Sequence, residues 1–88
     1  MTTLKQEEGS GYETLHGMRW MYIAVERNGK TVSHDYIEET ACGWAYNEED
    51  QPRERNLDDN LGHILAGMSG CQISALMETL WNGKEARV

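Results

Sequence analysis

The stretch MRWMYIAVERNGKTVSHDYIE, residues 18–38, decides the fold because it carries the strongest β-strand signal in the chain. At its centre stands Asn28-Gly29, the dipeptide that a two-residue type I′ turn prefers, since both central positions of that turn need a positive φ. The sequence therefore predicts an antiparallel hairpin whose turn is formed by residues 28 and 29.

The two-residue turn also predicts which residues of the two strands face one another. The expected pairs on one face are Val25 with Val32, Ile23 with His34, Met21 with Tyr36, and Arg19 with Glu38. This face is largely aliphatic and suits a core, and it ends in a pair of opposite charges. The other face combines large aromatic residues with polar ones, so we expect it to be half covered or to contact a partner.

Outward from the hairpin the signals are weaker. Residues 1–10 are polar and flanked by Gly and Ser, which predicts a disordered arm. Residues 11–16 are expected to add a short edge strand. In residues 40–46 the large side chains alternate, which favours a third strand; one helical turn is the alternative, although Gly43 weakens a helix.

A charged loop, residues 47–55, is expected next, and Pro52 within it excludes a central strand. Asn56 and Asp59 then resemble a capping box with Asp in place of Glu. The helix expected after them has its apolar residues on one stripe. That stripe consists of Leu57, Leu61, Ile64, Leu65 and Met68.

A second helix is predicted directly after the first. Ser69 and Gln72 have the spacing of a capping box, and Gly83 suits the left-handed residue that ends a helix. Its apolar stripe is Ile73, Leu76, Met77, Leu80 and Trp81. Residues 84–88 are expected to form a flexible, charged C-terminal tail.

Together these patterns predict the α+β class. We expect an antiparallel sheet of three to four strands with a C-terminal helical hairpin packed on one face, in a single domain spanning residues 11–83. Residues 60–83 carry a single charged residue, Glu78. They still do not predict a membrane span, which needs about 20 continuous apolar residues, because polar residues interrupt the segment.

The opposite side of the predicted helices carries small, neutral residues where a surface helix usually carries Lys and Glu. These are Gly62, Ala66, Cys71 and Ala75. They indicate that part of the helical hairpin packs against another chain, either a second copy in a homodimer or a target protein. The alternative is that they only pack the two helices on each other.

The charge balance bears on the type of partner. The chain has 15 acidic and 8 basic residues and a net charge of -7. Phosphate contacts require clustered Lys and Arg, and the sequence has no such cluster. We therefore expect no direct binding of nucleic acid, and a partner protein with a basic surface instead.

Catalysis and cofactors are not indicated. The candidate metal ligands, which lack any recognised ligand spacing, are His16, His34, His63, Cys42 and Cys71. No nucleophile lies beside a base in a recognisable pattern. We expect no enzyme activity, no metal and no cofactor. The first 12 residues have no apolar signal-peptide region, so both cysteines are predicted to be free thiols of a cytoplasmic protein.

The function predicted from these features is that of a non-enzymatic binding module that regulates or inhibits its partner. The residues expected to contact the partner are Trp20, Tyr22, Trp44, Glu48, Glu49, Asp50, Asp58 and Asp59. Large basic surfaces belong mostly to proteins that handle nucleic acid. By class analogy, small acidic inhibitors of CRISPR or restriction systems, encoded by phages and mobile elements, act in this way.

The alternative is a small dimeric transcription regulator. Ala66, Gly70 and Leu76 have a spacing that resembles a helix-turn-helix, which would place the hairpin at residues 57–82. Against this, the second helix carries Glu78 and no Lys or Arg, so phosphate contacts would be missing.

Overall fold

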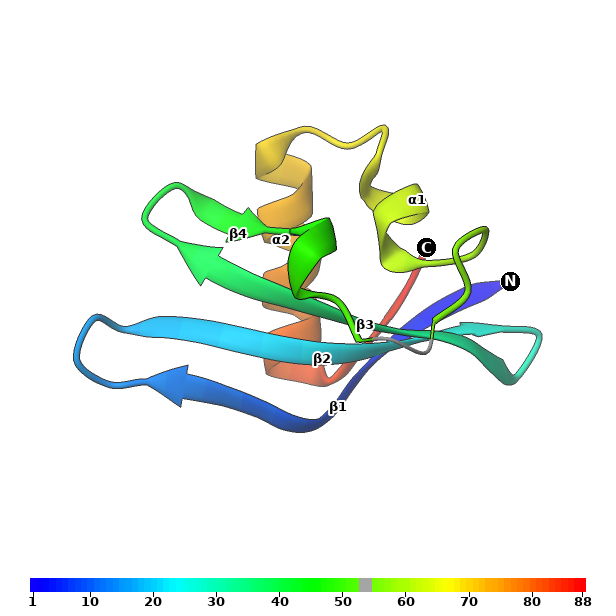
Figure 1. Ribbon diagram of the computed structural model, residues 1–88, viewed down its shortest axis with the longest axis horizontal. Coiled ribbons are helices and arrows are strands. Elements are labelled where there is room, and N and C mark those ends of the chain that lie inside the picture. The colour runs from blue at the N-terminus through cyan, green and yellow to red at the C-terminus, as the bar shows by residue number, and fades with distance from the viewer. Residues whose placement is uncertain (53–54) are drawn as a thin grey trace.

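A curled antiparallel sheet forms the body of the molecule in the computed structural model, which describes residues 1–52 and 55–88 (Figure 1). Within these residues the sheet has five strands in the order β4-β3-β2-β1-β5. The strands are β1 (Thr2–Glu13), β2 (Met18–Arg27), β3 (Lys30–Thr40), β4 (Gly43–Ala45) and β5 (Glu85–Arg87). The helices are the 3₁₀-helix η1 (Glu48–Asp50), α1 (Leu61–Leu65) and α2 (Gly70–Gly83). The α+β class and the strand in residues 40–46 are confirmed.

The sheet has more strands than predicted because both ends of the chain belong to it. The predicted disordered arm is most of β1, and the predicted flexible tail is β5. Leu4 of β1 is fully buried, and it faces Ala86 of β5 in the β1–β5 ladder. The arm is ordered by pairing with β2 along most of its length, and the tail is ordered by pairing with Thr3–Lys5 of the arm. The polar composition of the two segments does not reveal these long-range pairings.

The hairpin between β2 and β3 has the predicted turn but not the predicted register. Asn28 and Gly29 have φ values of 51° and 79°, as the turn requires. Arg27 faces Lys30 as expected, but beyond a bulge at Val32 the register shifts, so that Val25 faces Ser33. Such a bulge adds one unpaired residue to one strand.

The shift reverses the predicted faces of β3 beyond the bulge, because a one-residue change in register moves each side chain to the opposite face of the sheet. Ile23 faces Asp35 and Met21 faces Ile37, in place of the predicted His34 and Tyr36. The core face of β3 therefore carries Ser33, Asp35 and Ile37, all of them buried. Arg19 correspondingly binds Glu39 and not Glu38. The faces of β2 itself are as predicted.

The first predicted helix is much shorter than expected, so the helical hairpin is not formed. α1 begins after Asn60, which caps it by accepting a hydrogen bond from the backbone N–H of His63, whereas Leu57 is 67% exposed. The start of α1 is held by Asp35, whose carboxylate accepts a 3.2 Å hydrogen bond from the backbone N–H of Leu61. The hydrogen bond between Leu61 and the distant Asp35 thus fixes the start of α1 at Asn60, although the local sequence predicted a start at Asn56.

α2 matches its prediction closely. Ser69 and Gln72 form the reciprocal capping box, and the helix ends at Gly83. The residue in the left-handed conformation is Lys84, with φ 64°, and not Gly83 as predicted. In the part of the chain that the structure describes, no helix is long and apolar enough to cross a membrane.

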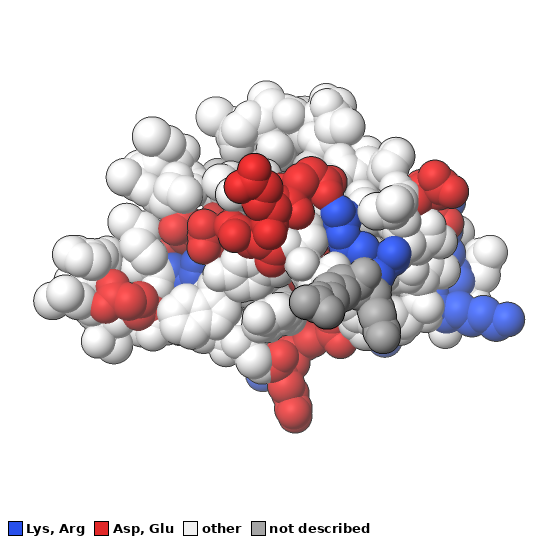
Figure 2. Space-filling model, in the orientation of Figure 1, with Lys and Arg blue, Asp and Glu red and all other residues white. Residues whose placement is uncertain are grey.

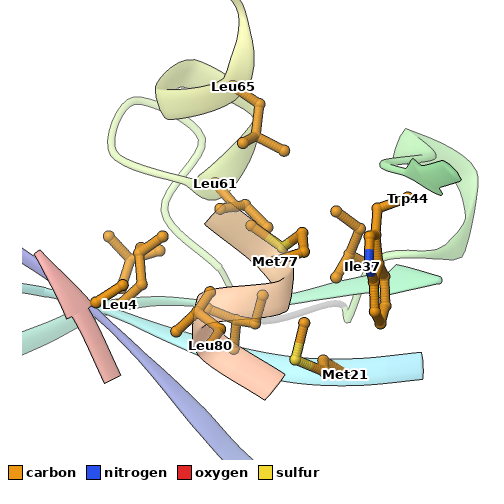
Figure 3. Packing of buried hydrophobic residues seen from close by; sticks show 11 residues of the cluster. Leu4, Met21, Ile37, Trp44, Leu61, Leu65, Met77 and Leu80 are labelled. Carbon is orange, nitrogen blue, oxygen red and sulfur yellow. The ribbon is translucent and has the colours of Figure 1, made fainter. Parts of the chain in front are cut away.

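The hydrophobic core lies between the sheet and the helices (Figure 3). α2 contributes Met77 and Leu80, and α1 contributes Leu61 and Leu65. The sheet contributes Leu4, Met21, Ile23, Val25, Ile37, Trp44 and Ala86. Because the helices cover only one face of the sheet, the other face of β2 and β3 is left for different contacts.

Candidate functional site

A shallow groove of about 320 Å³ lies on the sheet face opposite to α2. It is lined by three aromatic rings and two carboxylates, those of Trp20, Tyr22, Tyr36, Glu38 and Asp50. Three of these residues, Trp20, Tyr22 and Asp50, are predicted partner-binding residues, and they come together from β2 and η1. Tyr36 and Glu38 were not predicted, because only the bulge at Val32 places them on the sheet face that carries Trp20 and Tyr22.

An irregularity in β1 positions the indole of Trp20. The register between β1 and β2 shifts between Glu7 and Gly11, and Gly9 in this bulge has φ 93°. The carbonyl oxygen of Gly9 accepts a 2.9 Å hydrogen bond from Nε1 of Trp20. A Cβ on Gly11 would lie only 2.7 Å from Cε2 of Trp20, so the ring rests directly on the backbone of β1. The groove wall is therefore fixed before any partner binds.

Tyr22 and Tyr36 form the floor of the groove. Their ring centroids are 5.2 Å apart and their planes are tilted by 51°, a favourable arrangement for two aromatic rings. The Tyr36 hydroxyl donates a 3.1 Å hydrogen bond to Glu38. Burial is the main cause, and this hydrogen bond the second, that raises the pKa of Tyr36 to about 12. The hydroxyl therefore stays protonated at neutral pH and fixes one oxygen of the Glu38 carboxylate.

Asp50 reaches the groove because η1 is tied to β3. Asn47 caps η1 by accepting a hydrogen bond from the backbone N–H of Glu49. Gln51 then pairs with the backbone of Tyr36: its Oε1 accepts from the N–H and its Nε2 donates to the carbonyl, both at 2.8 Å. The side chain of Gln51 thus makes the two backbone hydrogen bonds that a neighbouring strand would make at this edge of β3. This attachment places η1, with its acidic residues, beside the aromatic residues of the groove.

The surface around the groove is acidic. Asp and Glu side chains gather across the middle of the face on which η1 lies (Figure 2). Glu48 is bound by Arg55. Within residues 1–52 and 55–88, no ion pair involves Glu38, Glu49 or Asp50. Carboxylates beside aromatic faces form an arrangement that attracts cations.

The remaining predicted partner residues lie elsewhere. Trp44 is 7% exposed and belongs to the core under α2, so its prediction as a surface anchor is wrong. Asp59 forms a 2.9 Å ion pair with Arg27 at the end of the β2–β3 hairpin. Asp58 is exposed in the segment before α1 and does not line the groove.

Two of the predicted self-association residues, Gly62 and Ala66, line a second pocket of about 310 Å³. Gly62 lies against Tyr46, whose ring leaves little room for a side chain at that position. Ala66, Cys71 and Ala75 are exposed. The alternative, in which the small residues pack the two helices on each other, is therefore wrong for these three, and a homodimer stays a prediction.

Cys42 and Cys71 are both free thiols, as predicted. Among the described residues, no three His, Cys, Asp or Glu side chains come close enough together to hold a metal ion. Asp35, although fully buried, is fully engaged: it accepts hydrogen bonds from Tyr46 and from the N–H of Leu61, and it pairs with Arg55 at 3.6 Å. Its role in this arrangement is structural.

The groove thus joins three predicted partner-binding residues, Trp20, Tyr22 and Asp50, to Tyr36 and Glu38. Comparisons with protein-family models, with curated proteins and with solved structures each found no match.

Proposed function

We propose that this protein is a non-enzymatic binding module that docks on a basic surface of a partner protein and thereby regulates or inhibits it. The observation that carries the proposal is the groove, in which Trp20, Tyr22 and Asp50 converge with Tyr36 and Glu38. Tyr and Trp are enriched at the energetic centres of protein interfaces, and complementary charge speeds association and selects the partner.

Inhibition follows physically if the partner handles nucleic acid. The basic surface of such a protein binds phosphates, and an acidic module on that surface excludes them by occupying the same side chains. The net charge of -7 supports long-range attraction to such a surface. The class analogy to inhibitors encoded by phages and mobile elements is part of this proposal.

The first test is capture of the partner with the immobilised protein, followed by binding measurements on the purified partner. Asp50→Lys should weaken binding by about tenfold or more, because it places a like charge against the basic surface. The matched control is Glu85→Lys, which makes the same change of charge at an exposed position of β5. The partner should also lose affinity for its nucleic acid as the wild-type protein is added.

Two outcomes would contradict the proposal. One is an equal effect of Asp50→Lys and Glu85→Lys, which would mean that the groove is not the contact. The other is direct binding of the protein to random duplex DNA in a mobility-shift assay at low salt, which would mean that the protein binds nucleic acid itself.

A further inference from the structure

The protein already binds one of its own arginines, Arg19, with two aromatic rings and two carboxylates in a partly buried site between the sheet and α2. The guanidinium carbon of Arg19 lies 5.0 Å from the ring centroid of Trp44 and 5.2 Å from that of Trp81. The guanidinium donates 2.7 Å hydrogen bonds to Glu39 and to Glu78. Arg19 projects from β2 toward α2, and the carboxylates that hold it come from β3 and α2.

The groove repeats this combination on the reverse side of the same strand. Trp20 follows Arg19 in β2 and therefore projects to the opposite face. There, Trp20, Tyr22 and Tyr36 supply aromatic faces, and Glu38 and Asp50 supply the carboxylates. No Lys, Arg or His of residues 1–52 and 55–88 lines this groove. The Arg19 site shows what these residue types hold when they converge, and among the described residues no arginine occupies the groove.

We infer that the groove binds an arginine side chain carried by the partner protein. This inference rests on the proposed function and names the chemistry at the centre of the contact. Arginine fits better than lysine, because a planar guanidinium stacks on aromatic faces while its N–H groups reach carboxylates at its edge. The Tyr36 hydroxyl holds the carboxylate of Glu38, and Gln51 ties the end of η1, which carries Asp50, to the backbone of β3.

The size and surroundings of the groove favour an arginine on a protein over a free small molecule. About 320 Å³ lies at the lower end of the range for ligand pockets, roughly 300–1,000 Å³, which is enough for one side chain. The acidic surface also continues beyond the groove to Glu49, which is exposed. A peptide chain that inserts one arginine can use this further surface, whereas a free amino acid cannot.

A titration with three matched peptides tests the inference. The probes are a tri-arginine peptide, a tri-lysine peptide and a tri-citrulline peptide, in which the neutral urea group keeps the shape of arginine. Binding is followed by NMR through the indole N–H signal of Trp20, assigned with Trp20→Phe. We expect a saturable shift with the arginine peptide, binding weaker by about three- to tenfold with lysine, and no saturable shift with citrulline.

Variants then locate the bound guanidinium. Glu38→Gln and Asp50→Asn should each weaken binding of the arginine peptide by about three- to tenfold, the effect of losing a charge-assisted hydrogen bond. Glu85→Gln is the control, because it makes the same change in net charge away from the groove. The NMR spectrum of each variant shows directly that it is folded. Tyr22→Leu, which keeps apolar area but removes the ring, should also weaken binding.

Four outcomes would overturn the inference: an unshifted Trp20 signal, equal binding of the lysine or citrulline peptide, an equal effect of Glu85→Gln, or binding of free L-arginine as tightly as the peptide. The inference and the proposed function fail in different ways. If partner capture depends on Asp50 but the arginine peptide does not bind, only the inference fails. If the peptide binds and no partner depends on the groove, the proposed function fails.

Discussion

At the scale of single residues, two glycines of β1 determine where the aromatic wall of the groove lies. Gly11 has no Cβ, and this allows the indole of Trp20 to lie across β1. Gly9 occupies a backbone conformation that other residues rarely adopt, and its carbonyl oxygen holds the indole N–H. The position of the aromatic wall is therefore determined by the backbone of the neighbouring strand.

Gly11→Ala should consequently displace Trp20. The added methyl group would overlap the indole ring, and relief requires a shift of a packed side chain, at a cost of about 1–3 kcal/mol in the free energy of unfolding. Urea denaturation measures this loss, and the NMR shift of the Trp20 indole reports the displacement. The control is Gly67→Ala, where nothing lies within 4 Å of the added group. An unchanged indole signal in Gly11→Ala would show that the ring does not rest on β1.

At the scale of secondary-structure elements, Arg19 joins β2, β3 and α2. Its hydrogen bonds to Glu39 and Glu78, in that order, raise the pKa of Arg19. The hydrogen bond from Arg19 is in turn the main reason why the pKa of Glu39 is lowered. Both Arg19 and Glu39 are about four-fifths shielded from water, so this pair contributes more than an exposed ion pair does.

The shift predicts how stability depends on pH. Because the pKa of Glu39 is lower in the folded protein, its contribution is complete above the ordinary glutamate pKa, about 4.3, and is lost as the pH falls through the lower, folded-state pKa. At pH 7, Glu39→Gln should lower the free energy of unfolding by about 1–2 kcal/mol. The difference from the wild type should shrink as the pH falls below about 4.

Urea denaturation across this pH range checks the expectation. Glu85→Gln, at an exposed position on β5, is the control and should leave the pH dependence almost unchanged. A Glu39→Gln difference that stays constant down to pH 2 would mean that the ionised carboxylate does not stabilise the fold.

The elements also show how far the sequence predicts the structure. The turn at Asn28-Gly29, the buried face of β2 and the capped start of α2 each depend on residues close together in the chain, and all three were predicted. The bulge at Val32 has no comparable local signal, because Val is an ordinary strand residue. The start of α1 depends on Asp35, 26 positions away from Leu61.

The same distinction applies to the candidate site. Trp20, Tyr22 and Asp50 were predicted from residue type and charge, which local sequence carries. Tyr36 and Glu38 reach the groove only through the register shift, so they could not be assigned without it. Trp44 has the same residue type as Trp20, but its strand places it under α2, and residue type alone does not distinguish a surface anchor from a core residue.

At the scale of the whole molecule, the two ends of the chain close the sheet. β5 pairs with β1 from Thr3–Arg87 to Lys5–Glu85, and the N–H of Val88 donates a 3.0 Å hydrogen bond to the carbonyl of Thr2. α2 leads directly into β5, so this pairing fixes the C-terminal end of the helix above the core. It also covers the edge of β1 at Thr3–Lys5, where the backbone groups would otherwise be open to another strand.

Removal of residues 85–88 should therefore weaken the whole fold. The loss comprises the β1–β5 hydrogen bonds and the burial of Ala86 against Leu4, which together amount to about 1–3 kcal/mol. Urea denaturation measures the loss, and amide exchange should show reduced protection along β1. Glu85→Ala is the control, because this side chain is exposed and its replacement should change stability by less than about 0.5 kcal/mol. A truncated protein with unchanged stability and protection would mean that residues 84–88 are the flexible tail that their composition suggests.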